Sequence, residues 1–353
     1  IAQVSLMLVL SRFLFAACVV VVAAASLPAQ TREIVRPRGY KPPIFAPSAE
    51  LKRLIDDAVG SVVNGDRPVT VKSTELAVTV IDLTDHANMR WAQYRGEEPI
   101  YPASVVKMFY MAALERQLED KKVTMTAELE RGLKDMIVDS SNEATQYILD
   151  VLTDTSSGAE MPQKRFEAWQ FKRNRVNRWL ASMGYTNINV NQKTFCEDAY
   201  GIEQQSRAYK GQNRNMLTTN ATARMLAEIV TGNIAPPERT ARMMTLLKRD
   251  PFAKSSDPDS QSNGFTGLAL IERKMVNAKL WSKAGWTSKS RHDAAYIETP
   301  DGQKLIVVVY TENHANERNI IPTIVGAIID GIAKGANMTG GGVAGQRTAT
   351  ERR

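Results

Sequence analysis

Residues 101–114 read YPASVVKMFYMAAL, a run that predicts a buried helix beginning just after a proline. Pro102 fixes the entry to this helix, and the apolar residues that follow suit a domain interior. Ser104 and Lys107 are three residues apart, so a helix places both side chains on one face. Buried surroundings would lower the pKa of the lysine, which could then take the proton of the serine hydroxyl. The pair therefore suits covalent catalysis, and a helix cap beside a snorkelling lysine is the structural alternative.

Two further short motifs follow this pair in a fixed order. The first is SSN at residues 140–142, which would also make a good helix start. The second is KAG at residues 283–285, in a strand-like stretch that ends at Trp286 before a turn-rich loop. Lys283 offers a positive charge for a substrate carboxylate, and Gly285 lets the strand backbone approach a ligand without a Cβ in the way. Each motif alone is weak evidence for catalysis, and the catalytic interpretation depends on the three motifs occurring in this order.

Together the three motifs resemble those of class A β-lactamases and penicillin-binding proteins. The resemblance implies that Ser104 is the acylated nucleophile and Lys107 its base. It implies further that Ser140 relays a proton to the leaving nitrogen and that Asn142 holds Lys107 and the substrate's side-chain amide. An oxyanion hole would come from the backbone N–H groups of Ser104 and Trp286.

Two positions depart from the class A pattern. Ser141 stands where class A enzymes usually carry aspartate, and it is closer to the S-x-N form of penicillin-binding proteins. Ala284 stands where the family has Thr or Ser more often, which removes one hydroxyl from the site.

The resemblance also implies a loop glutamate that activates the deacylating water. Glu197 is the best positional candidate within residues 191–203, and Glu203 is the second. The family's E-x-x-L-N pattern is missing, because Gly201 stands where asparagine is expected. A solvated loop glutamate is the alternative interpretation of Glu197.

The order of elements predicts an α+β fold, because two strands are followed by many helices, three strands and a closing helix. This order resembles the β-lactamase/transpeptidase-like fold, an antiparallel sheet flanked by helices with an inserted all-helical lobe. The predicted strands cover residues 75–82, 89–94, 278–286, 290–298 and 304–311, and the predicted closing helix covers 320–333.

Four segments are expected along the chain. We interpret residues 1–29 as a signal peptide, with an uncleaved membrane anchor as the alternative, so we expect an exported, periplasmic or secreted protein. Residues 30–48 read as a proline-rich linker, 49–337 as the catalytic domain and 338–353 as a disordered tail. Cleavage near Ala29 would leave Cys196 as the only cysteine, which excludes an internal disulfide.

Basic residues are concentrated in an insertion over residues 155–179, where aromatic residues interleave with them. One interpretation is a basic helix facing an anionic surface, and the other is an amphipathic helix with a solvated basic face. The net charge of +7 suits anionic neighbours such as peptidoglycan.

Other classes of function fit less well. The chain has three histidines and no G-x-S-x-G elbow, which disfavours a histidine-based serine hydrolase. Nothing has zinc-ligand spacing, so we expect no metal or other cofactor, and a nucleic-acid binder would not explain the three motifs. We expect a monomeric hydrolase that opens β-lactam amides through an acyl-serine. A DD-peptidase acting on D-Ala-D-Ala-like peptides and a slow-turnover β-lactam or peptidoglycan-binding protein are the alternatives.

Overall fold

The structure is a computed structural model that describes residues 32–65 and 69–340. The expected signal peptide over residues 1–29 and the tail beyond Gly340 lie outside these residues. None of the helices in the described part of the chain is long and apolar enough to cross a lipid bilayer.

A seven-stranded sheet with the order β1-β3-β2-β7-β6-β5-β4 forms the centre of the domain. Its pairs are antiparallel except β1 with β3. The predicted strands over 290–298 and 304–311 are confirmed, whereas the short edge strands were not predicted, because two residues carry no periodic pattern. The strands are β1 (Ala46–Pro47), β2 (Leu76–Asp82), β3 (Arg90–Tyr94), β4 (Lys248–Arg249), β5 (Lys279–Trp286), β6 (Ser290–Glu298) and β7 (Lys304–Glu312).

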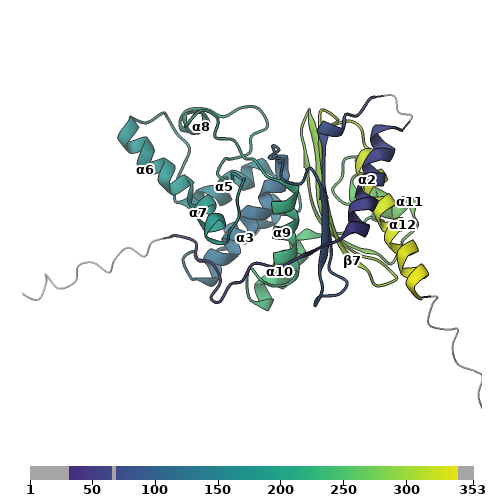
Figure 1. Cartoon of the computed structure of the whole chain (residues 1–353). Helices are drawn as coiled ribbons and strands as arrows, with labels where there is room; N and C mark the ends of the chain where they lie inside the picture. Colours follow the sequence, from purple (N-terminus) through teal and green to yellow (C-terminus); the bar gives the residue numbers. More distant parts are fainter. Residues whose placement is uncertain (1–31, 66–68, 341–353) are drawn as a thin grey trace, which may run out of the picture. The chain divides into compact units, whose positions relative to one another are not determined.

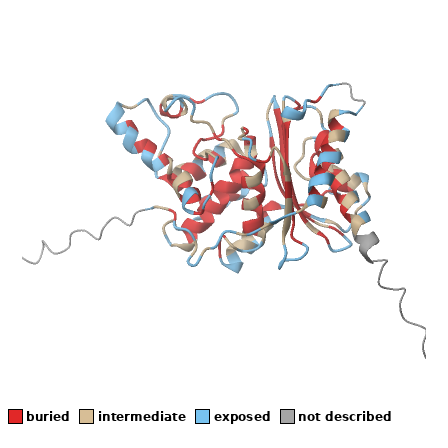
Figure 2. Ribbon diagram, in the orientation of Figure 1, coloured by how far each residue is buried: buried red, intermediate tan, exposed pale blue. Residues whose placement is uncertain are grey.

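The central strands are buried on both faces, which explains their continuous apolar sequence. Alternate residues of β2 enter different cores: Val78 and Val80 lie in one, Ala77 and Ile81 in the other. Figure 2 shows these strands as buried along their length, with helices covering both sides.

Helices cover the two faces of the sheet in separate groups (Figure 1). One face carries α2 (Ala49–Val63), α11 (Thr266–Glu272) and α12 (Ile320–Gly340). The other face carries the helical lobe, which enters the chain between β3 and β4 and confirms the predicted α+β architecture. The lobe consists of α3 (Val106–Glu119), α4 (Ala127–Ile137), α5 (Asn142–Thr153), α6 (Gln163–Arg173), α7 (Arg175–Ser182), α8 (Ile202–Arg207), α9 (Thr219–Val230) and α10 (Pro237–Leu247).

Helix α3 is the buried centre of this lobe. Every residue from Val106 to Leu118 is buried, so the helix has no solvated face and little amphipathic character. A lysine in its first turn, at position 107, is therefore placed in the interior rather than at the surface. This burial is the physical basis of the site described below.

The segment before α2 packs against the domain, which differs from the linker predicted over residues 30–48. Ile34 is buried, and Tyr40 donates a hydrogen bond of 2.6 Å to Glu228 Oε1 on α9. Strand β1 adds backbone pairing with β3. The prolines of this segment do favour an extended chain, but its apolar and aromatic residues give that chain a surface to pack on.

Candidate active site

Ser104 lies in a tight 3-10 turn, η2 (Ala103–Val105), that leads directly into α3. The turn packs closely against strand β5 at Gly285. A Cβ built on Gly285 would lie 2.7 Å from Pro102 O and 3.0 Å from Ser104 N, closer than side chains approach. Glycine is therefore required here because the strand and the nucleophile turn are in contact. The sequence predicted a close approach at Gly285, but to a ligand.

A buried histidine fixes the segment just ahead of Ser104. His292 Nε2 lies 3.0 Å from Tyr101 O, and its Nδ1 accepts a hydrogen bond of 3.1 Å from Thr311 N. Because Nδ1 is an acceptor, the ring proton is on Nε2 and is donated to Tyr101. Burial lowers the pKa of His292 to about 4, so the ring is neutral near pH 7. The sequence motifs gave no signal for this role, since the histidine is distant in the chain.

Lys107 is fully buried and is held by the second motif. Its Nζ donates to Ser140 O at 2.5 Å and to Asn142 Oδ1 at 2.9 Å, whereas Ser140 Oγ is 3.4 Å away. Burial lowers the pKa of Lys107 to about 7. A neutral amine has two N–H donors, which match the two short contacts and leave the lone pair free.

The Ser104 hydroxyl makes no hydrogen bond to any residue that the structure describes. Catalytic hydrogen bonds are often loose in unliganded enzymes and tighten when substrate binds. The free lone pair of Lys107 and the unpaired hydroxyl of Ser104 are thus both available for a proton transfer. The structure brings Lys107 together with Ser140 and Asn142, and it places Ser104 one helical turn away.

Ser140 lies between two lysines. Its Oγ is 3.4 Å from Lys107 Nζ and 3.0 Å from Lys283 Nζ. Its backbone has a φ of 59°, a left-handed conformation that costs a non-glycine residue about 1–2 kcal/mol. That conformation lets the Ser140 carbonyl and hydroxyl both meet Lys107, so the strain is located in the candidate site.

Lys283 is fully buried on β5, which has a neighbouring strand on each side. Its Nζ donates to Ser140 Oγ at 3.0 Å, Gln261 Oε1 at 2.5 Å and Ala284 O at 2.8 Å. Burial lowers the pKa of Lys283 well below its usual range, and the charges of Lys107 and Arg249 lower it further. The sequence identified this lysine but not its burial or its partner Gln261.

Two charged residues that the motifs did not reveal complete the site. Arg249 on β4 is buried and donates to Leu246 O and Ile137 O at 3.0 and 2.9 Å. Asp293 on β6 is buried, and burial raises its pKa. Its Oδ2 accepts a hydrogen bond of 3.1 Å from Thr266 N. Asp293 thus lies close enough to Lys283 and Arg249 for its charge to raise the pKa of each of them, against the effect of burial.

A cavity of about 540 Å³ opens at these residues. Trp286 is half-exposed at its rim, and its indole N–H donates to Ala315 O at 3.1 Å. The cavity is therefore bounded by all three motifs together with the loop between β4 and α11. Its lining includes Ser104, Asp139, Ser140, Asn142, Arg249, Asp257, Asp259, Gln261, Phe265, Ala284 and Trp286.

The loop that was expected to supply a catalytic glutamate presents a cysteine to the site instead. Asn142 Nδ2 lies 3.3 Å from Cys196 Sγ. Glu197 is exposed, and its side chain makes no hydrogen bond to any of the described residues. The structure therefore does not bring Glu197 into contact with Lys107 or Ser140, and its role as a base stays a prediction.

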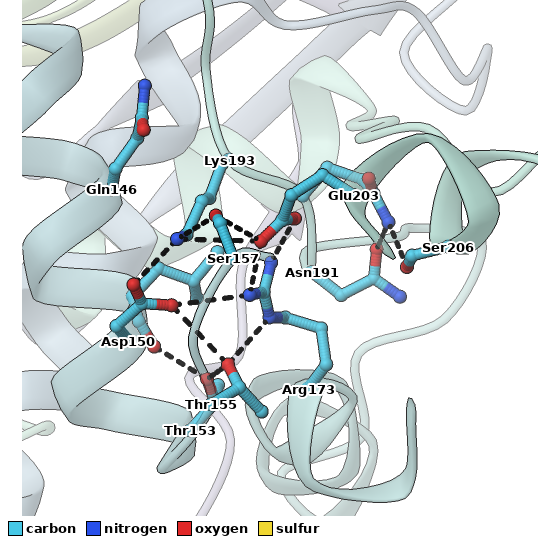
Figure 3. A network of polar contacts seen from close by, with 12 residues as sticks. Gln146, Asp150, Thr153, Thr155, Ser157, Arg173, Asn191, Lys193, Glu203 and Ser206 are labelled. Atoms are coloured by element: carbon cyan, nitrogen blue, oxygen red, sulfur yellow. Dashed lines mark hydrogen bonds and ion pairs between the residues drawn. The ribbon is translucent and has the colours of Figure 1, made fainter. Parts of the chain in front are cut away.

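Glu203, the second candidate base, belongs to a buried ion-pair network of the helical lobe (Figure 3). Arg173 donates to both of its carboxylate oxygens, at 2.7 and 2.8 Å, and Lys193 Nζ is 3.4 Å away. Lys193 also pairs with Asp150 at 2.6 Å. Burial alone would raise the pKa of Glu203, but Arg173 and Lys193 hold it below its usual value. The Glu203 carboxylate therefore pairs with Arg173 and Lys193 inside the helical lobe, and these ion pairs give it a structural role.

The same network changes the interpretation of the basic insertion over residues 155–179. The structure forms helices α6 and α7 there, and Arg173 and Arg175 are buried rather than solvated. Arg173 also lies over the ring of Trp169, 4.3 Å from its centroid. Part of the basic pattern therefore stabilises the lobe instead of facing an anionic surface or solvent.

Comparisons with known proteins agree with the fold described above. A model of the β-lactamase enzyme family matches residues 69–332. A β-lactamase from Sphaerobacter thermophilus is similar in structure, with 19% identity, a TM-score of 0.55 and coverage of 81% of this chain and 98% of its own. PBP-A has 16% identity and a TM-score of 0.55, and the match covers 83% of this chain and 100% of its own. A representative of class A β-lactamases from Bacteroides cellulosilyticus has 14% identity and a TM-score of 0.55, and the match covers 80% of this chain and 99% of its own. No curated protein sequence matches the chain significantly.

Proposed function

The chain belongs to the β-lactamase enzyme family, and from this membership we propose that it opens β-lactam amides through an acyl-enzyme on Ser104. The observation that carries the proposal is the buried Lys107. Its pKa of about 7 makes it a base at neutral pH, and it sits one helical turn from an unpaired serine hydroxyl. A solvated lysine, with a pKa near 10.4, would be almost fully charged.

The proposed reaction follows from the contacts of these groups. Ser104 Oγ attacks the lactam carbonyl carbon while Lys107 Nζ takes the hydroxyl proton. The backbone N–H groups of Ser104 and Trp286 receive the charge that develops on the carbonyl oxygen. The C–N bond then breaks, and the leaving nitrogen takes a proton from Ser140 Oγ, which regains one from Lys107. Water finally hydrolyses the ester and releases Ser104.

Mass spectrometry of the intact protein after mixing with penicillin G tests this proposal. We expect one adduct of the mass of the drug, absent from Ser104→Ala, which then disappears as the ester is hydrolysed. An adduct that forms equally in Ser104→Ala would contradict the assignment. Glu197→Gln is followed in parallel: trapping of the adduct in this variant alone would identify Glu197 as the deacylating base, because an amide cannot take a proton from water.

A penicillin-binding protein with slow turnover, such as a DD-peptidase, is the second candidate function. It is favoured by the missing carboxylate: Lys107, Ser140 and Asn142 form no hydrogen bond to an acidic side chain within the residues described. An adduct that persists for hours in the unmodified protein would support this second function. A D-Ala-D-Ala peptide would then be the substrate to assay.

We further propose that Lys283 binds the substrate carboxylate. Lys283→Ala is expected to lower kcat/KM for penicillin G by a factor that corresponds to about 2–4 kcal/mol of transition-state stabilisation, because the substrate carboxylate loses its binding partner at this site. The methyl ester of the same penicillin should lose less. Steady-state kinetics with the two substrates measure the difference, and an equal loss for both would contradict carboxylate recognition.

Export is proposed on the sequence of residues 1–29 alone. The envelope is where β-lactams and cell-wall peptides are met, so an exported enzyme agrees with the proposed chemistry. Fractionation of cells that express the full chain, with immunodetection in each fraction, tests the location.

A further inference from the structure

The side chain of Gln261 crosses the candidate active site from one wall to the other. Its Oε1 accepts hydrogen bonds from Lys283 Nζ at 2.5 Å and Ala284 N at 3.3 Å. Its Nε2 donates to Val138 O at 2.8 Å and lies 3.4 Å from Ile137 O. A single neutral amide thus joins strand β5 to the segment that leads from α4 to the second motif.

This contact saturates the lysine that the proposed function assigns to the substrate. Lys283 Nζ has three acceptors, Ser140 Oγ, Gln261 Oε1 and Ala284 O, which already equal the greatest number of N–H donors that a lysine amine can offer. A substrate carboxylate can therefore bind Lys283 only by replacing one of them. Ala284 O belongs to the strand backbone, and Ser140 is held by its own contact with Lys107. Gln261 is the replaceable partner.

The backbone that carries Gln261 is anchored, so the exchange needs only a side-chain rotation. Asp259, two residues earlier, pairs with Arg291 at 2.7 Å and with Arg318 at 2.9 Å. Hydrogen bonds from Arg318 and Arg291 lower the pKa of Asp259 to about 2, so the anchor is charged at all physiological pH values. Arg291 also donates to Gly264 O at 2.5 Å, which ties the other end of the loop.

We propose that Gln261 is a built-in competitor of the substrate carboxylate, filling the Lys283 subsite in the unliganded protein and setting the affinity for anionic substrates. The inference rests on the proposed function, because it names the group that the substrate must displace. A carboxylate can replace the amide, since hydrogen bonds to an ionised acceptor are stronger than those to a neutral one. Displacement also frees Ala284 N–H, which becomes a donor for the second carboxylate oxygen. Ligands with only a neutral acceptor must also displace Gln261 from Lys283, but the weaker hydrogen bond that they form offsets less of the cost of that displacement.

Two substitutions at this position should have opposite effects. Gln261→Ala removes the competitor, so the fraction of molecules with an open subsite rises and the apparent Kd for penicillin G falls by about tenfold. Gln261→Glu, which is nearly the same size, replaces the amide by a carboxylate that pairs with Lys283. This variant should raise the apparent Kd by tenfold or more.

Calorimetric titration of penicillin G measures these constants, with every variant placed in the Ser104→Ala background so that binding is read without acylation. Gln212→Ala is the matched control, because that glutamine is exposed and lines a different cavity. Benzoate, a carboxylate without a lactam ring, is titrated in parallel by NMR. The affinity for benzoate shows whether Gln261 blocks Lys283 even if the protein does not bind β-lactams. This titration therefore separates failure of this inference from failure of the proposed function.

Weaker binding of both ligands by Gln261→Ala would overturn the proposal, because it would make Gln261 a contact that supports binding. An unchanged Kd in both Gln261 variants would overturn it as well. A purely structural role predicts that both variants bind less tightly, together with a lower midpoint of thermal unfolding. Only the opposite signs of the two substitutions support a competitor.

Discussion

Replacing Lys107 with alanine is expected to slow the acylation of Ser104 by roughly 10³–10⁴-fold. The serine hydroxyl is a poor nucleophile unless a base takes its proton, and the described site offers Lys107 as the amine with a pKa near neutrality. Stopped-flow or quenched-flow measurement of adduct formation gives the rate constant directly. A loss below tenfold would show that another group is the base.

The pH dependence of acylation carries the same information in the unmodified protein. Burial lowers the pKa of Lys107 to about 7, and the neutral amine is the active form. The rate should therefore rise with pH through about 7, level off above it, and fall about tenfold for each pH unit below it. Lys107→Arg is the control that keeps the positive charge, because a guanidinium cannot lose its proton in this range. The residual acylation rate of this variant should not rise with pH near pH 7.

Glu203→Gln is expected to lower the free energy of unfolding by about 3–5 kcal/mol. Among the described residues, the variant leaves the fully buried Arg173 with only the more distant Asp150 as a charged partner, at 3.3 Å. Lys193 loses one of its two carboxylates. Equilibrium unfolding in urea, followed by circular dichroism, measures the change. The same variant should still form an adduct on Ser104, since Glu203 is held by structural cations.

The matched control is Glu128→Gln, which also removes one carboxylate from an arginine. The partner of Glu128 is Arg131, and both side chains are well exposed, so solvent screens the pair and the expected loss of stability is much smaller than for Glu203→Gln. If the two variants lost equal stability, the burial of the ion pairs around Glu203 would not add to their contribution to stability. If Glu203→Gln trapped the adduct instead of destabilising the fold, Glu203 would be the deacylating base after all.

The sequence was sufficient for those parts of the fold that follow from local patterns. Strands β6 and β7 are runs of residues buried on both faces, and Pro102 marks the start of the 3-10 turn that leads into α3. Residues of all three motifs line one cavity. Local patterns set the period and the ends of an element, so these features are visible without any tertiary contact.

The parts that could not be predicted depend on contacts between distant residues. Gln261 meets Val138 across more than a hundred residues, and no local pattern marks either position. Cys196 and Glu197 are both exposed, yet Cys196 lies 3.3 Å from Asn142 Nδ2 while Glu197 makes no hydrogen bond to the described residues. Adjacent side chains on an irregular loop have no fixed period, so only the fold decides which of them contacts the site.

The position of Ser140 between two lysine nitrogens makes the charge of the ligand part of the chemistry. Two charged amines so close to one hydroxyl would repel each other, and the charge of Lys107 lowers the pKa of Lys283. A carboxylate that arrives at Lys283 favours the protonated form of that lysine, and the added positive charge in turn favours the neutral, basic form of Lys107. We therefore expect an anionic substrate to promote the activation of the serine that will attack it.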